Sequence, residues 1–146
     1  MVVRGSALGF RKGNDMKAQP SGVPRPTEAE LEILHVLWSR DECTVREVHE
    51  VLHLSGGTGY TTALKLLQVM HGKGLVSRDE TQRAHVYRAT VSKERTQKRF
   101  LRDLVQRVFD GSSSQLVLHA LGSQRASREE LREIRSLLNK LDKDVP

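Results

Sequence analysis

The chain has 146 residues, 37% hydrophobic and 29% charged, which is typical of one globular domain or a small domain with an appended helical unit. No stretch approaches the roughly 20 apolar residues of a membrane span, and no N-terminal apolar run is long enough for a signal peptide, so we expect a cytoplasmic protein. The single cysteine, Cys43, excludes an intrachain disulfide and any multi-cysteine metal site.

The net charge of +6 is concentrated in one part of the chain. Residues 58–99 carry nine basic and three acidic residues, whereas residues 25–57 carry three basic and seven acidic ones. A basic segment of this kind indicates a polyanionic partner. Charge alone is equally consistent with a solvated basic face.

Residues 1–25 are rich in glycine, proline, serine and basic side chains and show no apolar period, which predicts a disordered basic tail. Met16 is an alternative start of translation.

Order is expected from Thr27, which forms a Thr-x-x-Glu capping box with Glu30. This box opens a helix over residues 28–39, with Trp38 in its apolar stripe. A second capping box, Thr44 with Glu47, opens a short helix.

A third helix is predicted from about Tyr60 to Gly72, followed by a hairpin. The helix has an apolar stripe for burial, formed by Ala63, Leu66, Leu67 and Met70. Residues 75–78 and 84–88 are expected to be strands joined by a polar turn at residues 79–83.

The rest of the chain is predicted to be helical, over about residues 93–109, 112–121 and from 127 onward. Capping boxes are expected at Ser112 with Gln115 and at Ser127 with Glu130. Three short helices cannot bury their own apolar stripes, so a second copy of the chain is expected to cover them, although folding back onto the rest of the chain is an open alternative. The residues assigned to dimerisation are Phe100, Leu101, Leu104, Val108, Leu116, Leu118, Leu121, Leu131, Ile134 and Leu138.

The order helix, helix, turn, helix, hairpin is typical of a winged helix-turn-helix. We therefore predict a mainly α fold with a small β-hairpin wing: a winged-helix DNA-binding domain over residues 26–91 and a C-terminal helical dimerisation domain over residues 92–146. The major groove admits one helix, and the helix before it crosses the phosphates. The predicted DNA-binding residues lie on the outer face of the third helix and on the hairpin: Tyr60, Thr61, Thr62, Lys65, Gln68, Arg78, Arg83 and Arg88. Helix capping by Thr61 and Thr62 is the open alternative to base reading.

One motif points to a different class of protein. Residues 49–53 read His-Glu-x-x-His, the pattern that holds zinc in metalloproteases. Catalytic zinc needs a third protein ligand and a cleft, and no further ligand pattern is visible, so we expect no catalytic residue, metal or cofactor, and no enzyme. Incidental metal binding by His49 and His53 is an open alternative. A winged helix that binds proteins instead of DNA is the second alternative, which the polar and basic outer face of the third helix disfavours.

Three stretches resemble the penicillinase repressor family, which includes methicillin-resistance and copper-transport repressors. They are residues 26–34 with Trp38, Gly59 to Leu64 (Gly-Tyr-Thr-Thr-Ala-Leu), and Lys73 to Val76 (Lys-Gly-Leu-Val) with Tyr87. The resemblance covers about residues 26–142. It implies a homodimeric transcriptional repressor whose winged helices bind a pseudo-palindromic operator.

In several members of that family, a membrane-bound sensor protease triggers cleavage of the repressor after an antibiotic signal, between Asn and Phe in the stretch matching residues 116–121. Here that stretch contains Leu118, His119 and Ala120 and has no Asn-Phe pair. The copper-sensing branch has a cysteine-rich tail, which this chain lacks. The resemblance implies operator DNA, a second copy and a sensor protease as partners, derepression by proteolysis, and no small-molecule substrate or membrane. The missing Asn-Phe pair counts against the cut made in those members, and the missing cysteines count against copper sensing.

Overall fold

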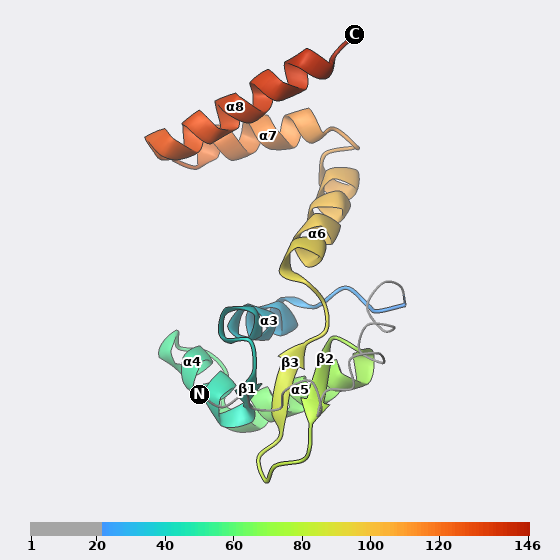
Figure 1. Cartoon of the computed structure of the whole chain (residues 1–146), viewed down its shortest axis with the longest axis vertical. Coiled ribbons are helices and arrows are strands. Elements are labelled where there is room, and N and C mark those ends of the chain that lie inside the picture. The colour runs from blue at the N-terminus through green and yellow to red at the C-terminus, as the bar shows by residue number, and fades with distance from the viewer. Residues whose placement is uncertain (1–21) are drawn as a thin grey trace. The chain divides into compact units, whose positions relative to one another are not determined.

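The structure is a computed structural model that describes residues 22–146, and the chain forms two compact units divided after Phe100 (Figure 1). Between residues 22 and 92, the first unit has three helices followed by a hairpin, with one further short strand between the first two of these helices. Its elements are α3 (Glu28–Arg40), β1 (Cys43–Thr44), α4 (Val45–Leu54), α5 (Tyr60–Lys73), β2 (Val76–Asp79) and β3 (Val86–Ala89). The predicted fold class, mainly helical with a small β wing, is confirmed.

Both N-terminal capping boxes form as predicted. The Thr27 hydroxyl accepts a hydrogen bond from the Glu30 amide at 3.2 Å, and the Glu30 carboxylate accepts one from the Thr27 amide at 2.9 Å. Thr44 and Glu47 make the same reciprocal pair at 3.2 and 2.8 Å. Each box satisfies two amides that the first turn of a helix leaves without partners, so it fixes where α3 and α4 begin.

The sheet has three antiparallel strands in the order β1–β3–β2, so the hairpin has a partner that the sequence did not predict. Cys43 pairs with Tyr87, and Thr44 pairs with Val86. A two-residue strand has no periodicity of its own. The hairpin strands also lie one or two residues later than predicted, and Asp79, expected in the exposed turn, ends β2 as a buried residue.

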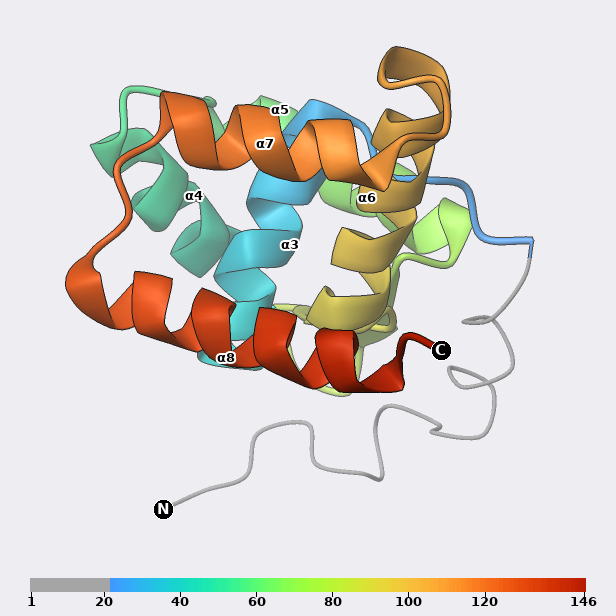
Figure 2. The same ribbon diagram turned by 90° about the horizontal axis from the view of Figure 1, so that it is seen from above.

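The hydrophobic core of this unit lies between the helices and the sheet. It is formed by fully buried side chains from α3, α4, α5 and β3 and from the residue that precedes β2, which include Ile33, Leu34, Leu37, Val48, Leu67, Met70, Tyr87 and Leu75. The helices α3, α4 and α5 pack against one another, and Figure 2 shows α4 beside α3. Trp38, predicted to be core, packs against it half-buried and donates a hydrogen bond from Nε1 to the Val91 carbonyl at 2.9 Å.

The packed part of the chain begins before Thr27. Val23 is buried in the core, and its carbonyl accepts a hydrogen bond from Arg99 at 2.7 Å. The Arg25 guanidinium lies over the Phe100 ring, 4.9 Å from its centroid. The expectation of disorder up to residue 25 therefore fails for residues 22–25, because a single apolar side chain in a polar stretch gives no periodic signal. Residues 1–21 and Met16 lie outside the described part of the chain.

The C-terminal part contains α6 (Lys93–Val108), α7 (Ser113–Ser123) and α8 (Arg128–Asp144), and α6 begins within the first unit. The Ser127 and Glu130 capping box forms as predicted. The Ser112 box is only half formed. The Ser112 hydroxyl accepts from the Gln115 amide at 3.2 Å, but the Ser112 amide donates to the Phe109 carbonyl at 2.8 Å and not to the Gln115 side chain. No helix within residues 22–146 is both long and apolar enough to cross a membrane.

Candidate nucleic-acid interface

The outer face of α5 is polar, exposed and free of internal bonds. Thr61, Thr62, Lys65 and Gln68 are all exposed, while Ala63, Leu67 and Met70 on the other side are fully buried. None of the four polar side chains makes a hydrogen bond or an ion pair with another residue of the described chain. Their donors and acceptors therefore face solvent.

The two threonines do not cap the helix. The N-cap of α5 is Gly59, and no side chain bonds to the free amides of the first turn. Thr61 and Thr62 follow as the second and third residues of the helix. The capping alternative therefore has no support in the geometry, and both hydroxyls stay available to a ligand.

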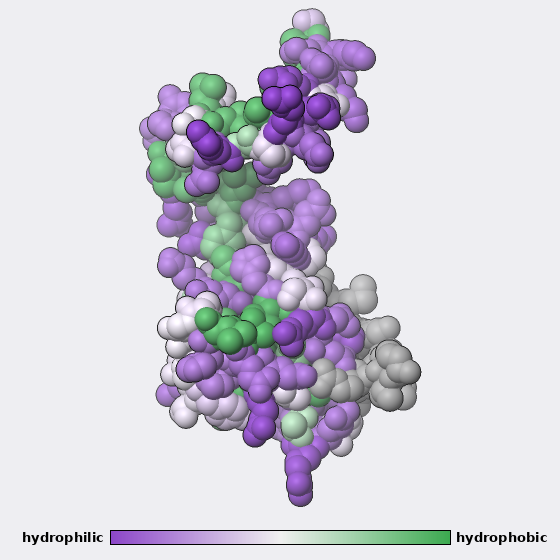
Figure 3. Space-filling model, turned by 90° about the vertical axis from the view of Figure 1, so that its left-hand side faces the viewer, coloured by the Kyte–Doolittle hydropathy of each residue, from purple (hydrophilic) through white to green (hydrophobic). Residues whose placement is uncertain are grey.

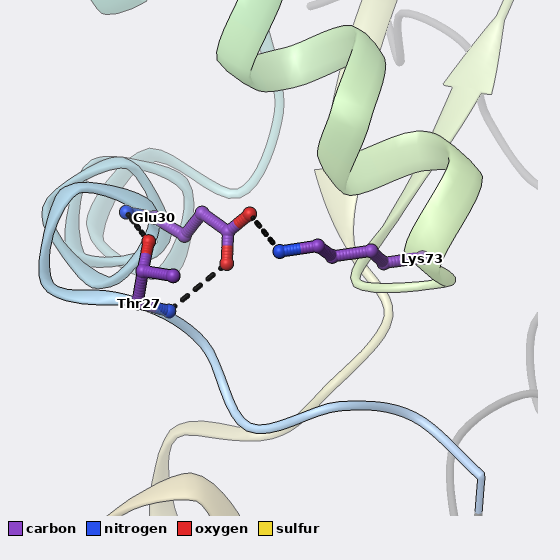
Figure 4. A network of polar contacts seen from close by, with 3 residues as sticks. All are labelled: Thr27, Glu30 and Lys73. Atoms are coloured by element: carbon purple, nitrogen blue, oxygen red, sulfur yellow. Dashed lines mark hydrogen bonds and ion pairs between the residues drawn. The ribbon is translucent and has the colours of Figure 1, made fainter.

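The C-terminal end of α5 is held by a partly buried ion pair (Figure 4). Lys73, the last residue of α5, donates to the Glu30 carboxylate at 2.7 Å, and the Glu30 side chain is 2% exposed. Burial raises the pKa of Glu30, but the bonds from Lys73 and Thr27 outweigh it and leave that pKa below its ordinary value. One carboxylate therefore caps α3 and ties it to the end of α5. The cap follows from the local sequence, whereas the ion pair does not, because its partners lie 43 residues apart.

The hairpin places its three arginines in different surroundings. Arg83 lies in the exposed tip and makes no ion pair with any residue from 22 to 146. Arg78 pairs with Glu80 at 2.5 Å, and Arg88 pairs with Glu42 at 2.9 Å. Arg83 is thus the one of the three whose charge no described carboxylate neutralises. The assignment of Arg78 and Arg88 to DNA requires phosphates to compete with these carboxylates.

The base of the wing is fixed by Asp79, which was not among the predicted site residues. One oxygen of its buried carboxylate accepts hydrogen bonds from the Thr81 amide at 2.9 Å and the Thr81 hydroxyl at 2.7 Å. The backbone bond from Thr81 is the main cause that lowers the pKa of Asp79. An Asp-x-Thr sequence directly after a strand was the available signal for this turn.

The His-Glu-x-x-His motif lies on α4, next to the start of α5. The rings of His49 and His53 are 5.4 Å apart, and the His49 ring meets the Tyr60 ring edge-on at 5.7 Å. Tyr60 is about half exposed. No group of three histidine, cysteine, aspartate or glutamate side chains in residues 22–146 is placed to hold a metal ion. The third ligand that a catalytic zinc needs is therefore not found in the part of the chain that the structure describes.

The apolar side chains assigned to dimerisation are all at least partly accessible. Figure 3 shows hydrophobic residues on the surface of the helical C-terminal part. Six are exposed: Leu101, Leu104, Val108, Leu118, Leu121 and Leu138. The other four are half-buried: Phe100, Leu116, Leu131 and Ile134. No described residue after Thr96 is fully buried, and α7 and α8 carry further exposed apolar side chains that were not assigned to dimerisation: Val117, Leu137 and Leu141. An apolar surface of this extent is unusual for a chain that works alone.

The chain is similar in sequence to a family of known proteins. The profile of the penicillinase repressor family matches residues 26–140. The transcriptional regulator BlaI of Mycobacterium tuberculosis is 31% identical over 122 residues, which are 82% of this chain and 87% of that protein. The methicillin resistance regulatory protein MecI of Staphylococcus aureus is 21% identical over 114 residues, 78% of this chain and 93% of the relative. The penicillinase repressor of Bacillus licheniformis is 23% identical over 116 residues, 80% and 91% of the two chains.

Proposed function

Because the chain belongs to the penicillinase repressor family and is thus a transcriptional repressor, we propose that it represses by binding operator DNA with the outer face of α5. The observation that supports this proposal is an exposed polar surface on α5 whose side chains bond to no other described residue: Thr61, Thr62, Lys65 and Gln68. The C-terminal end of this helix is held to α3 by the ion pair between Lys73 and Glu30. Threonine offers a hydroxyl to base edges and a methyl group to thymine, and lysine reaches guanine or a phosphate.

The wing and the start of α5 are proposed to hold the DNA backbone. Arg83 is the strongest of these contacts, because its charge is free to meet a phosphate. Arg78, Arg88 and Tyr60 are proposed to add to it. Such contacts fix the register of the protein on the duplex and carry no sequence information of their own.

A homodimer is proposed to bind a pseudo-palindromic operator. The support is the helical part of the chain, where apolar side chains on α6, α7 and α8 stay exposed in a single copy. Residues 26–91 are then the DNA-binding domain and residues 92–146 the dimerisation domain. Two-fold symmetry in the protein calls for two matching half-sites in the DNA.

The family resemblance also leads us to propose release of the operator by proteolysis, through a membrane-bound sensor protease that responds to an antibiotic-type signal. The repressor itself would act in the cytoplasm and without a catalytic activity of its own. Residues 116–121, where an Asn-Phe pair is cut in several relatives, lie in α7 and lack that pair. Cleavage here would therefore need a protease with a different specificity.

Selection from a random duplex library at physiological salt tests the DNA proposal. The wild-type chain should enrich an inverted repeat. Thr62→Ala and Lys65→Ala should each lower specific affinity by about 1–3 kcal/mol and relax preference at one position of each half-site. Arg83→Ala should weaken binding to all sequences alike and reduce the salt slope by about one.

Lys140→Ala, which removes an equal charge from the exposed surface of α8, is the matched control and should leave the preference unchanged. Bulk, salt-sensitive binding without any enriched motif would contradict the proposal and favour a winged helix that binds protein. An unchanged preference in the Thr62 and Lys65 variants would remove those residues from base reading.

A further inference from the structure

The repressor function leaves the two histidines of α4 unused. His49 and His53 are four residues apart, which places them on the same helix face. The His49 ring is half-buried and the His53 ring exposed, and neither imidazole makes a hydrogen bond or an ion pair with another residue of the described chain. Their ring nitrogens are therefore available to a ligand.

The spacing of the rings suits a shared metal ion. Imidazole nitrogens bind Zn²⁺ at about 2.0–2.1 Å, so two imidazoles on one ion have ring centroids about 5 Å apart. The observed separation of the ring centroids is 5.4 Å, close to that value, with the ring planes 37° apart.

The position on the helix also favours a cation. His53 lies in the last turn of α4, where the carbonyl groups at the helix end carry partial negative charge. Arg46 and Glu50 are both exposed and lie within a turn of His49, and their opposite charges leave no net charge beside the site. Imidazole ligands select late first-row divalent ions over Mg²⁺, which prefers oxygen.

We propose that His49 and His53 bind one late first-row divalent metal ion, such as Zn²⁺ or Ni²⁺, and that the bound ion acts on the first turn of α5 through Tyr60. The His49 ring touches the Tyr60 ring edge-on at 5.7 Å, and Tyr60 directly precedes Thr61 and Thr62. With two protein ligands, the ion keeps water in its other positions. A catalytic zinc site has three protein ligands, whereas this pair supplies two and no third is placed near it in residues 22–146, so the site is proposed to bind the ion without a reaction of its own.

Calorimetric titration of the full chain with Ni²⁺ and with Zn²⁺ at neutral pH tests the site without DNA. We expect one ion per chain, no binding of Mg²⁺, and an affinity at least about tenfold weaker in His49→Gln and in His53→Gln. His35→Gln is the matched control, because His35 is an exposed histidine on α3 with no histidine one turn away, and this variant should bind as the wild type does. Circular dichroism of each variant verifies that the fold is retained. Equal binding by the wild type and the His49→Gln/His53→Gln double variant would overturn the site.

The effect on α5 rests on the proposed DNA binding and is measured separately. Two added positive charges beside the DNA-facing helix should tighten binding to the selected operator by a few-fold in Zn²⁺, and the double variant should show no such change. Metal binding with unchanged operator affinity would overturn the coupling through Tyr60. Failure to bind any operator would count against the proposed function, whereas the calorimetric result would stand.

Discussion

A single carboxylate, that of Glu30, connects the start of α3 with the end of α5, the helix proposed to bind the operator. Glu30→Gln keeps an oxygen that can accept from the Thr27 amide but removes the ion pair with Lys73. Because the Lys73 side chain is 31% exposed, water partly compensates, and we expect the free energy of unfolding to fall by about 1–3 kcal/mol. Urea denaturation measures this loss. Glu130→Gln, in an exposed capping box without an ion pair, is the control and should have a smaller effect.

The same residue should make stability depend on pH. The pKa values of Glu30 and Asp79 lie below their ordinary values in the folded chain. A carboxylate of this kind stabilises the fold above its unfolded pKa, and that contribution disappears as pH falls through the folded pKa. The free energy of unfolding should therefore be constant near neutral pH and decrease as pH drops below about 5.

Urea denaturation at a series of pH values measures this dependence. Glu30→Gln should lose less stability than the wild type between pH about 5 and pH about 3, since it has one fewer group to protonate. Identical slopes for the two proteins in this range would show that Glu30 does not carry a lowered pKa.

At the scale of elements, two glycines near the end of α5 should respond in opposite ways to alanine. Gly74 is the C-cap of the helix at φ +85°, a left-handed conformation that costs a residue with a side chain about 1 kcal/mol. Gly72 lies inside the helix, and a Cβ there would meet no atom within 4 Å. Thermal unfolding should show Gly74→Ala destabilised and Gly72→Ala stabilised by about 0.5–1 kcal/mol. A change in melting temperature in the same direction for both variants would contradict the assigned end of α5.

The sequence predicted those elements that are fixed by residues close to one another along the chain. The capping boxes at Thr27, Thr44 and Ser127 form because both partners lie within four residues of each other. β1 was missed because its two residues become a strand only by pairing with β3, about 40 residues later. The same reason applies to the candidate site: the exposed face of α5 followed from its period, whereas the pairing of Arg88 with Glu42 depends on tertiary contacts.

At the scale of the whole molecule, the chain has a core in its first unit and none in its second. Buried side chains end at Thr96, and α7 and α8 carry exposed leucines along their length. Helices of 11 and 17 residues are marginal in water without a partner for their apolar faces. This contrast is the physical reason to expect association, independent of the family to which the chain belongs.

The dimer proposal predicts that one charge on α8 separates the two copies. Leu138 is about half exposed and lies in the stripe with Leu131 and Ile134, so Leu138→Asp would bury an unpaired carboxylate between the copies. Light scattering at micromolar concentration should show two chains for the wild type and one chain, 16.5 kDa, for the variant. The variant should also bind the operator more weakly, because each monomer would contact one half-site without the gain in affinity from a linked second copy. Asn139→Asp adds the same charge at the next exposed position, outside the stripe, and should remain a dimer. A wild-type chain that is already monomeric would mean that the exposed leucines serve another partner.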